Sequence, residues 1–117
     1  MSPGTLTIVL AGSPYGTERA ALALRLASAA LDRGHKVNLF PSADGTYAAL
    51  SGQVAKGLPD IGEELEALIA RGAKVGLCGG CLRYRGLTHD RLIAGVRPST
   101  LSGLGEMLRE ADVVLNL

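Results

Sequence analysis

The residues best able to do chemistry lie in one short segment, AKVGLCGGCLRYRG, at residues 73–86. It contains both cysteines of the chain, Cys78 and Cys81, followed closely by the guanidinium groups of Arg83 and Arg85. A thiolate is the nucleophilic form of cysteine, and nearby cations and helix N-termini stabilise it. The segment therefore predicts a reactive thiol, and the structural alternative for Cys78 is a small buried side chain.

The residues around Cys78 predict that it lies where a strand ends. Residues 73–77 form a short apolar run typical of a buried strand, and Gly79 and Gly80 allow a sharp turn with close backbone approach. In a parallel α/β sheet the C-terminal ends of the strands meet helix N-termini, whose free N–H groups bind ligands. A helical turn that begins near Cys81 would point its positive end at Cys78. We therefore place both glycines in the substrate-binding part of the site.

Ionising Cys78 near neutral pH requires help from neighbouring groups. A free thiol with a pKa of about 8.5 is only about 3% ionised at pH 7, and lowering that pKa by two units corresponds to roughly 2.7 kcal/mol. A helix terminus supplies roughly 0.3 to 2 kcal/mol, so at least one arginine must contribute. We expect Arg85 or Arg83 to do so, with a solvated surface side chain as the alternative for each.

Length and composition limit the classes of function. A chain of 117 residues with 47% hydrophobic content predicts one domain, residues 1–117, with an ordinary core. A net charge of +1 and scarce aromatic residues argue against direct nucleic-acid binding. Residues 1–12 lack a charged start and a long apolar run, and no window is apolar enough to span a membrane. We therefore expect a cytoplasmic protein without nucleic-acid or membrane partners.

Strands and helices are predicted to alternate along the chain. Strands are expected at residues 5–11, 35–40, 73–77, 95–97 and 112–117, and helices at residues 17–33, 60–71, 88–93 and 98–110. The first strand, helix and strand form a βαβ unit, whose right-handed crossover implies parallel strands. The sequence therefore predicts a three-layer α/β/α single domain with a mostly parallel five-stranded sheet.

Helix starts and one irregular segment complete the prediction. Thr17, Asp60 and Thr88 are expected to cap helices, and Ser99 is expected to start the last helix. That helix is expected to turn four residues inward: Leu101, Leu104, Leu108 and Ala111. Residues 41–59, rich in glycine and turn residues, are expected to form a mobile cover near the strand ends, with a turn at 42–45 and a short helix at 46–50.

The spacing of the two cysteines is also compatible with two other sites. A zinc site would need two more ligands, and His35 and His89 are poorly placed to supply them, so we expect no metal. A thioredoxin-type dithiol redox protein has the Cys-x-x-Cys spacing after a strand, but that fold carries its pair after an early strand. His89 is also a candidate proton relay, with an exposed surface residue as its alternative.

The glycine-containing loop at residues 12–18 could in principle hold the phosphate of a flavin on its backbone N–H groups. The chain is short for a flavodoxin and has few aromatic residues to enclose the flavin ring. A tight turn that leads into a helix is the simpler interpretation. In it, Glu18 is a charge at the helix start, and Asp44 in the next loop is a turn residue. We therefore expect no cofactor.

Several segments carry a resemblance to one family over nearly the whole chain. They are PYGTERA at 14–20, GHKVNLF at 34–40, Asp-Gly at 44–45, the thiol segment, Gly-Val at 95–96 and ADVVL at 111–115. With these segments the chain resembles the DsrE/DsrF-like sulfur-relay family. In members of the TusD and DsrE type the sulfur-accepting cysteine stands seven residues before the arginine of an Arg-Gly pair, as Cys78 does before Arg85 and Gly86 here.

The resemblance implies a persulfide carrier that works in sulfur metabolism or tRNA thiolation. Cys78 would accept sulfur from a donor protein and pass it to an acceptor protein, and Arg85 and Arg83 would surround the persulfide. Apart from the resemblance, Tyr15 and Tyr47 are candidates to line a substrate pocket over Cys78, with a half-buried core tyrosine as the alternative for each. The resemblance also implies a homo-oligomer, either a trimer or a hexamer.

Cys81 departs from the TusD pattern, which has no cysteine at that position. It either resolves the persulfide by forming a disulfide and releasing sulfide, or it only fills space. A rival function of another class is a non-catalytic oligomeric subunit or a small-ligand binding module, in which both thiols are incidental.

Overall fold

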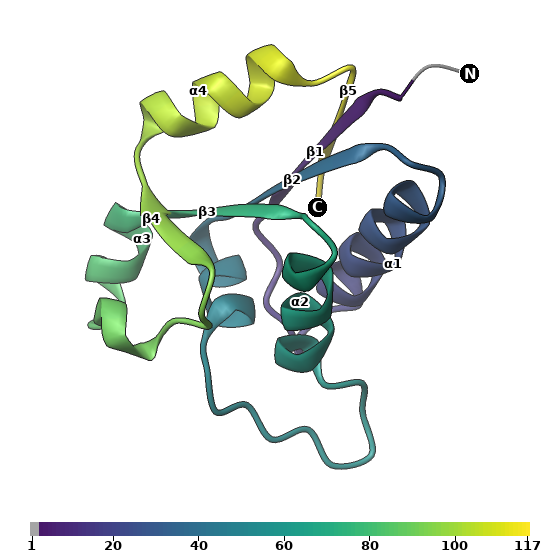
Figure 1. Ribbon diagram of the computed structural model, residues 1–117. Helices are drawn as coiled ribbons and strands as arrows, with labels where there is room; N and C mark the ends of the chain where they lie inside the picture. The colour runs from purple at the N-terminus through teal and green to yellow at the C-terminus, as the bar shows by residue number, and fades with distance from the viewer. Residues whose placement is uncertain (1–2) are drawn as a thin grey trace.

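The computed structural model describes residues 3–117 and contains one sheet of five parallel strands (Figure 1). The strands are β1 (Thr5–Leu10), β2 (Lys36–Pro41), β3 (Lys74–Cys78), β4 (Val96–Ser99) and β5 (Val113–Asn116), in the spatial order β4-β3-β2-β1-β5. The helices are α1 (Arg19–Asp32), α2 (Ile61–Ala70), α3 (Gly79–Tyr84) and α4 (Leu101–Glu110), with 3₁₀ helices η1 (Ala43–Ala49) and η2 (His89–Arg91). The predicted α/β fold and parallel sheet are confirmed.

The main hydrophobic core lies between the sheet and the helices α1 and α2. Ile8 of β1 pairs with Leu39 of β2, and both side chains are fully buried. The same cluster includes Leu24 of α1 and Leu65 of α2, which lie on the apolar faces that the helical spacing predicts. Burying this face fixes the register of the strands, because a slip by one residue would move every apolar side chain to the opposite face.

Helix α4 lies on the other side of the sheet from α1 and α2 (Figure 1). The sheet face beneath it carries the buried Thr7 and Asn38 and the buried aromatic ring of Phe40. The buried Thr7 hydroxyl donates a hydrogen bond to the carbonyl oxygen of Met107 at 2.9 Å. The buried Asn38 amide donates to the Thr7 hydroxyl and to a carboxylate oxygen of Glu110. A Cβ at Gly76 would lie 3.1 Å from the Met107 methyl group, so glycine lets this side chain approach the sheet. Polar contacts, Met107 and the buried Phe40 therefore lie between α4 and the sheet.

The prediction that α4 turns four apolar residues inward is wrong for Leu101 and Leu108. Leu101 is 80% exposed and Leu108 is 40% exposed, and no residue of the helix is fully buried. The spacing correctly identifies an amphipathic helix, but it cannot tell which surface covers the apolar side. Leu104 and Ala111 are half-buried, whereas Leu101 and Leu108 remain exposed.

The segment predicted as a mobile cover is instead anchored where it contains η1. Ser42 donates its backbone N–H to the carbonyl oxygen of Leu10 at 2.8 Å, and Gly45 donates to that of Ala11 at 3.1 Å. Thr46 is fully buried. The turn and the short helix predicted separately are one continuous 3₁₀ helix, because the end of β1 supplies backbone acceptors for it.

Three of the predicted helix starts differ from the structure. Asp60 caps α2 as predicted, since its carboxylate accepts a backbone N–H at 3.0 Å. Thr17 is not the N-cap of α1, which is Glu18, but its hydroxyl accepts the backbone N–H of Arg19, the first helical residue, at 3.2 Å. Thr88 precedes only the short η2. Ser99 is the last residue of β4, and Thr100 caps α4 instead. Among residues 3–117, no helix has the length and apolar character to cross a membrane.

Candidate functional site

Cys78 is both the last residue of β3 and the N-cap of α3, which confirms its predicted position at the C-terminal end of a strand. The helix begins at Gly79, earlier than expected, so the backbone N–H of Cys81 points back and donates to the Cys78 sulfur at 3.3 Å. The sulfur thus replaces the oxygen of an ordinary N-cap side chain. The thiol is half-buried and remains partly open to solvent.

The surroundings of Cys78 favour its ionised form. Burial acts to raise the pKa of the thiol, but hydrogen bonds from the Cys81 side chain and from the backbone N–H groups of Cys81 and Gly80 lower it. The positive charge of Arg83 lowers it further. The balance puts the pKa of Cys78 below the ordinary value for cysteine. A thiolate with a lowered pKa is the nucleophile that sulfur transfer requires.

Cys81 has the opposite character. Burial and the hydrogen bond that its S–H donates to Cys78 raise its pKa, while the N–H of Ala43 and the charge of Arg85 only partly offset this. The Cys81 sulfur accepts the Ala43 N–H at 3.2 Å. Ala43 has a φ of 48°, the only non-glycine residue with positive φ among residues 3–117, so this contact occurs at a strained backbone position. The second thiol therefore stays protonated beside the first.

The two arginines of the segment have different partners. The Arg85 guanidinium donates two hydrogen bonds to one carboxylate oxygen of Asp44, at 3.2 and 2.9 Å, and a third to the Cys81 carbonyl oxygen. It therefore joins η1 to α3 and acts electrostatically on Cys81. Arg83 is exposed, and its guanidinium lies near Gly79 and Gly80. The cation that lowers the pKa of Cys78 is therefore Arg83.

The glycine pair makes the turn beside the thiols possible. A Cβ at Gly79 would lie 3.2 Å from the backbone oxygen of Ser99 on β4, a very tight contact. A Cβ at Gly80 would meet the side chains of Arg83 and Tyr84 at 3.9 and 4.0 Å. Tyr84 is 91% exposed. The structure thus brings Gly79, Gly80 and Arg83 together with the thiols, as the sequence predicts.

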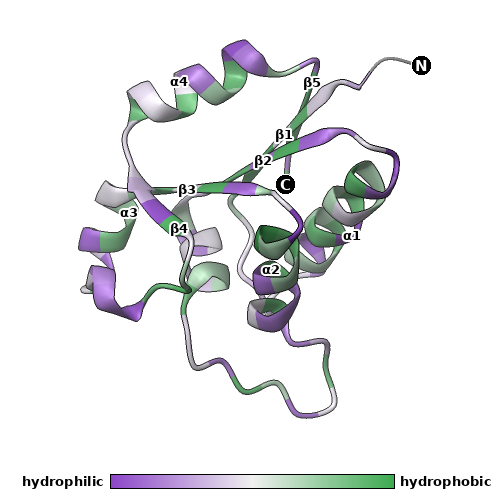
Figure 2. Cartoon of the chain, viewed as in Figure 1, coloured by the Kyte–Doolittle hydropathy of each residue, from purple (hydrophilic) through white to green (hydrophobic). Residues whose placement is uncertain are grey.

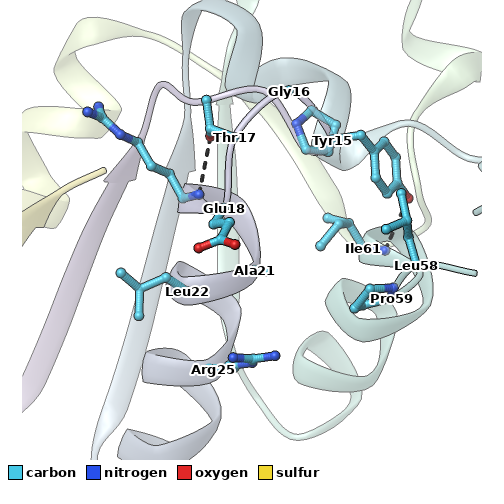
Figure 3. Close-up of a pocket in the computed structure, with 12 residues that line it drawn as sticks. Tyr15, Gly16, Thr17, Glu18, Ala21, Leu22, Arg25, Leu58, Pro59 and Ile61 are labelled. Atoms are coloured by element: carbon cyan, nitrogen blue, oxygen red, sulfur yellow. Dashed lines mark hydrogen bonds between the residues drawn. The ribbon is translucent and has the colours of Figure 1, made fainter.

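Tyr15 lies elsewhere. Its hydroxyl donates to a side-chain oxygen of Gln53 at 2.7 Å. It also accepts the backbone N–H of Ile61 at 3.2 Å (Figure 3). There it lines a hollow of about 750 Å³ between the start of α1 and the start of α2, and neither cysteine lines that hollow. These contacts tie Tyr15 to α2, so the structure does not place it over Cys78. Tyr47 lies on η1, and His89 is exposed on η2.

Two residues of the site could not be identified from the sequence. Ala43 contacts Cys81, and Asp44 binds Arg85, although each pair is separated by about forty positions in the chain. The Asp-Gly pair at 44–45 indicated only a turn, and an alanine carries no chemical signal. Within residues 3–117, no three His, Cys, Asp or Glu side chains are grouped in a way that could hold a metal ion.

Comparison with known proteins places the chain among relatives of its own length. Protein YchN of Escherichia coli is 37% identical over 112 residues, which cover 94% of this chain and 96% of that protein. An uncharacterized protein of Methanopyrus kandleri is 39% identical over 110 residues, which cover 94% of this chain and 91% of that protein. The crystal structure of YchN superposes with a TM-score of 0.90 at 33% identity and covers 99% of this chain and 100% of that one.

A more distant structure has the same fold. A protein of unknown function from Methanobacterium thermoautotrophicum matches with a TM-score of 0.77 at 12% identity, covering 99% of this chain and 100% of that one, and therefore shows the fold alone. The sequence profile of the DsrE/DsrF-like family matches residues 5–117, which include every strand and helix described above. The chain belongs to the DsrE/DsrF-like family.

Proposed function

We propose that this protein is a persulfide carrier that accepts sulfane sulfur on Cys78 and passes it to a partner protein. The observation that carries the proposal is the position of the Cys78 sulfur, half-buried at the start of α3, where it accepts a backbone N–H at 3.3 Å. The same donors and the nearby Arg83 that lower the pKa of the thiol would also stabilise a persulfide anion.

The proposed reaction is a sulfur transfer between two thiols. The Cys78 thiolate attacks the outer sulfur of a donor persulfide, and the donor leaves as a thiolate. One sulfur–sulfur bond forms as another breaks, so no external oxidant or reductant is needed. In the second step, a thiolate of the acceptor protein attacks the outer sulfur held on Cys78. The exposed Tyr84 and Arg83 lie near Gly80, two residues after Cys78, and both residue types are common at sites of protein contact.

A mass measurement tests the carrier function. After incubation with a cysteine desulfurase and cysteine, the Cys81→Ser variant should gain about 32 Da, the mass of one sulfur atom. It keeps the N–H that faces Cys78 and replaces the second thiol with a hydroxyl donor. The Cys78→Ser variant is the matched control and should gain nothing. A mass gain in Cys78→Ser, or none in Cys81→Ser with this donor or with inorganic polysulfide, would contradict the proposal.

The hollow lined by Tyr15 supports a second candidate, a small-ligand binding module. Its volume of about 750 Å³ is that of an ordinary ligand site, and its lining includes Glu18, Arg25 and the apolar Leu22 (Figure 3). In that function the thiols would be incidental. Unmodified thiols in both cysteine variants after the sulfur-transfer experiment would favour this candidate.

We also propose that the protein forms a homo-oligomer through α4 and β5. Hydrophobic residues alternate with hydrophilic ones along α4 (Figure 2), and the exposed apolar side chains include Leu101 at 80% and Leu108 at 40%. The neighbouring end strand β5 adds Val113 and Val114, which are 53% and 41% exposed. Exposed apolar side chains on an outer helix and on an end strand are typical of surfaces that a second copy covers.

Leu101→Glu should convert the oligomer to a monomer, because each interface would have to bury a carboxylate without a partner. Light scattering after size-exclusion chromatography measures the mass directly. The control is Leu58→Glu, which changes a comparably exposed leucine in the loop before α2 and should leave the mass unchanged. A wild-type protein that is monomeric at about 100 µM would contradict the proposal, since its association would then be weaker than roughly 5.5 kcal/mol.

A further inference from the structure

The carrier function leaves one chemical group without a role, the thiol of Cys81. Its backbone N–H donates to the Cys78 sulfur at 3.3 Å, and its own sulfur accepts the Ala43 N–H at 3.2 Å. The two residues occupy the N-cap and the third residue of α3. The two thiols therefore belong to the same helical turn, and the Cys81 sulfur is held there by η1.

We propose that Cys81 discharges the persulfide on Cys78, which releases sulfide and closes a Cys78–Cys81 disulfide. This inference rests on the proposed carrier function. It adds a second activity at the same site, an intramolecular reaction that removes the sulfur when no acceptor protein has taken it.

The step balances without any further reactant. The Cys81 sulfur attacks the inner sulfur of the persulfide, the one bonded to the Cys78 Cβ, and the outer sulfur leaves as hydrosulfide with the proton that Cys81 gives up. The bond between the inner and outer sulfur breaks as the bond between the two cysteines forms. The sulfane sulfur is reduced to sulfide, and the two cysteine sulfurs are oxidised. A dithiol reductant then restores the starting protein.

The contact with η1 indicates how this discharge is kept slow. The Cys81 sulfur accepts the Ala43 N–H at 3.2 Å, so it must leave this donor to bond with Cys78. The thiol must also lose its proton, and burial keeps its pKa high. Ala43 belongs to η1, which Asp44 ties to α3 through Arg85. Transfer to an acceptor protein therefore has time to occur before the sulfur is released.

Time-resolved mass spectrometry tests the discharge. The reduced wild type and Cys81→Ser are loaded with inorganic polysulfide, desalted rapidly and followed without an acceptor. The wild type should change from a gain of about 32 Da to a loss of about 2 Da, while one sulfide appears per chain. The product should resist iodoacetamide until dithiothreitol is added. Cys81→Ser should keep its added sulfur at least about tenfold longer, because it has no second thiolate.

The outcomes separate the two proposals. If the wild type and Cys81→Ser keep the added sulfur equally long, the discharge is overturned and the carrier function stands. A disulfide that forms without one released sulfide per chain also overturns the discharge. If Cys81→Ser takes up no sulfur from polysulfide or desulfurase, the carrier function fails.

The amide of Ala43 gives a second readout that does not depend on counting sulfur. In the reduced protein its N–H donates to the Cys81 sulfur. Disulfide closure should therefore shift the Ala43 resonance in a ¹H–¹⁵N spectrum, and dithiothreitol should reverse the shift. An Ala43 resonance that stays fixed in a protein proven to be disulfide-bonded would contradict the proposed movement of Cys81.

Discussion

Gly45→Ala should destabilise the protein by about 3 kcal/mol or more, one of the largest effects expected of a single methyl group. A Cβ at this position would lie 2.0 Å from the carbonyl oxygen of Leu10 and 2.8 Å from its carbonyl carbon. These are backbone atoms of a central strand and cannot rotate away, so η1 would have to move off the end of β1. Urea denaturation should show the loss, and the melting temperature should fall by about 10 °C or more.

Gly105→Ala is the matched control for this prediction. Gly105 lies inside α4, and a Cβ there would have no neighbour within 4 Å. Because alanine favours a helix over glycine, this variant should be about 0.5 to 1 kcal/mol more stable than wild type. If Gly45→Ala were as stable as Gly105→Ala, the close packing of η1 against β1 would be wrong. The position of Ala43 beside Cys81 would then lose its support.

The second large effect concerns the reactivity of the two thiols. With limiting iodoacetamide at about pH 7, Cys78 should be alkylated about tenfold faster than Cys81. The pKa of Cys78 is lowered and that of Cys81 is raised, so below both values Cys78 holds the larger fraction of thiolate. As the pH rises past the pKa of Cys78, its rate should level off while the rate of Cys81 continues to increase. The ratio of the two rates should therefore shrink.

Peptide mass mapping of the alkylated protein measures both rates in one sample. Arg83→Gln should slow the alkylation of Cys78 about twofold at low salt, and less at high salt, because an exposed charge is screened. Arg85→Gln is the control, since Arg85 acts on Cys81 and binds Asp44. Equal rates at Cys78 and Cys81 across the pH range would contradict the asymmetry of the pair.

Much of the fold follows from local patterns in the sequence. The apolar runs and the helical spacing on either side of Asp60 correctly predict five strands and the main helices, because burying one apolar face requires these periodicities. The apolar strand followed by two glycines also correctly places Cys78 where β3 ends. The chemistry of this segment could therefore be recognised before its surroundings were known.

The predictions from sequence failed where contacts between segments distant in the chain determine the structure. Residues 41–59 contain enough glycine and turn residues to suggest mobility, but the backbone acceptors at the end of β1 anchor η1. Similarly, the spacing of leucines in α4 predicts an apolar face without indicating which of its side chains the sheet covers, and Leu101 stays open to solvent. Local sequence patterns determine whether a segment becomes a helix or a strand, and the neighbouring elements determine which residues it contacts.

The sequence by itself determined that two thiols and two arginines share one turn at the end of a strand. Only the tertiary structure decided which arginine acts on which thiol, because it brings η1 against α3. Asp44 binds the guanidinium group of Arg85, and the backbone N–H of Ala43 donates a hydrogen bond to the Cys81 sulfur. Both contacts join positions about forty residues apart, and no local pattern encodes which donor or charge will face a given sulfur. The difference in pKa between the two cysteines is thus a product of packing.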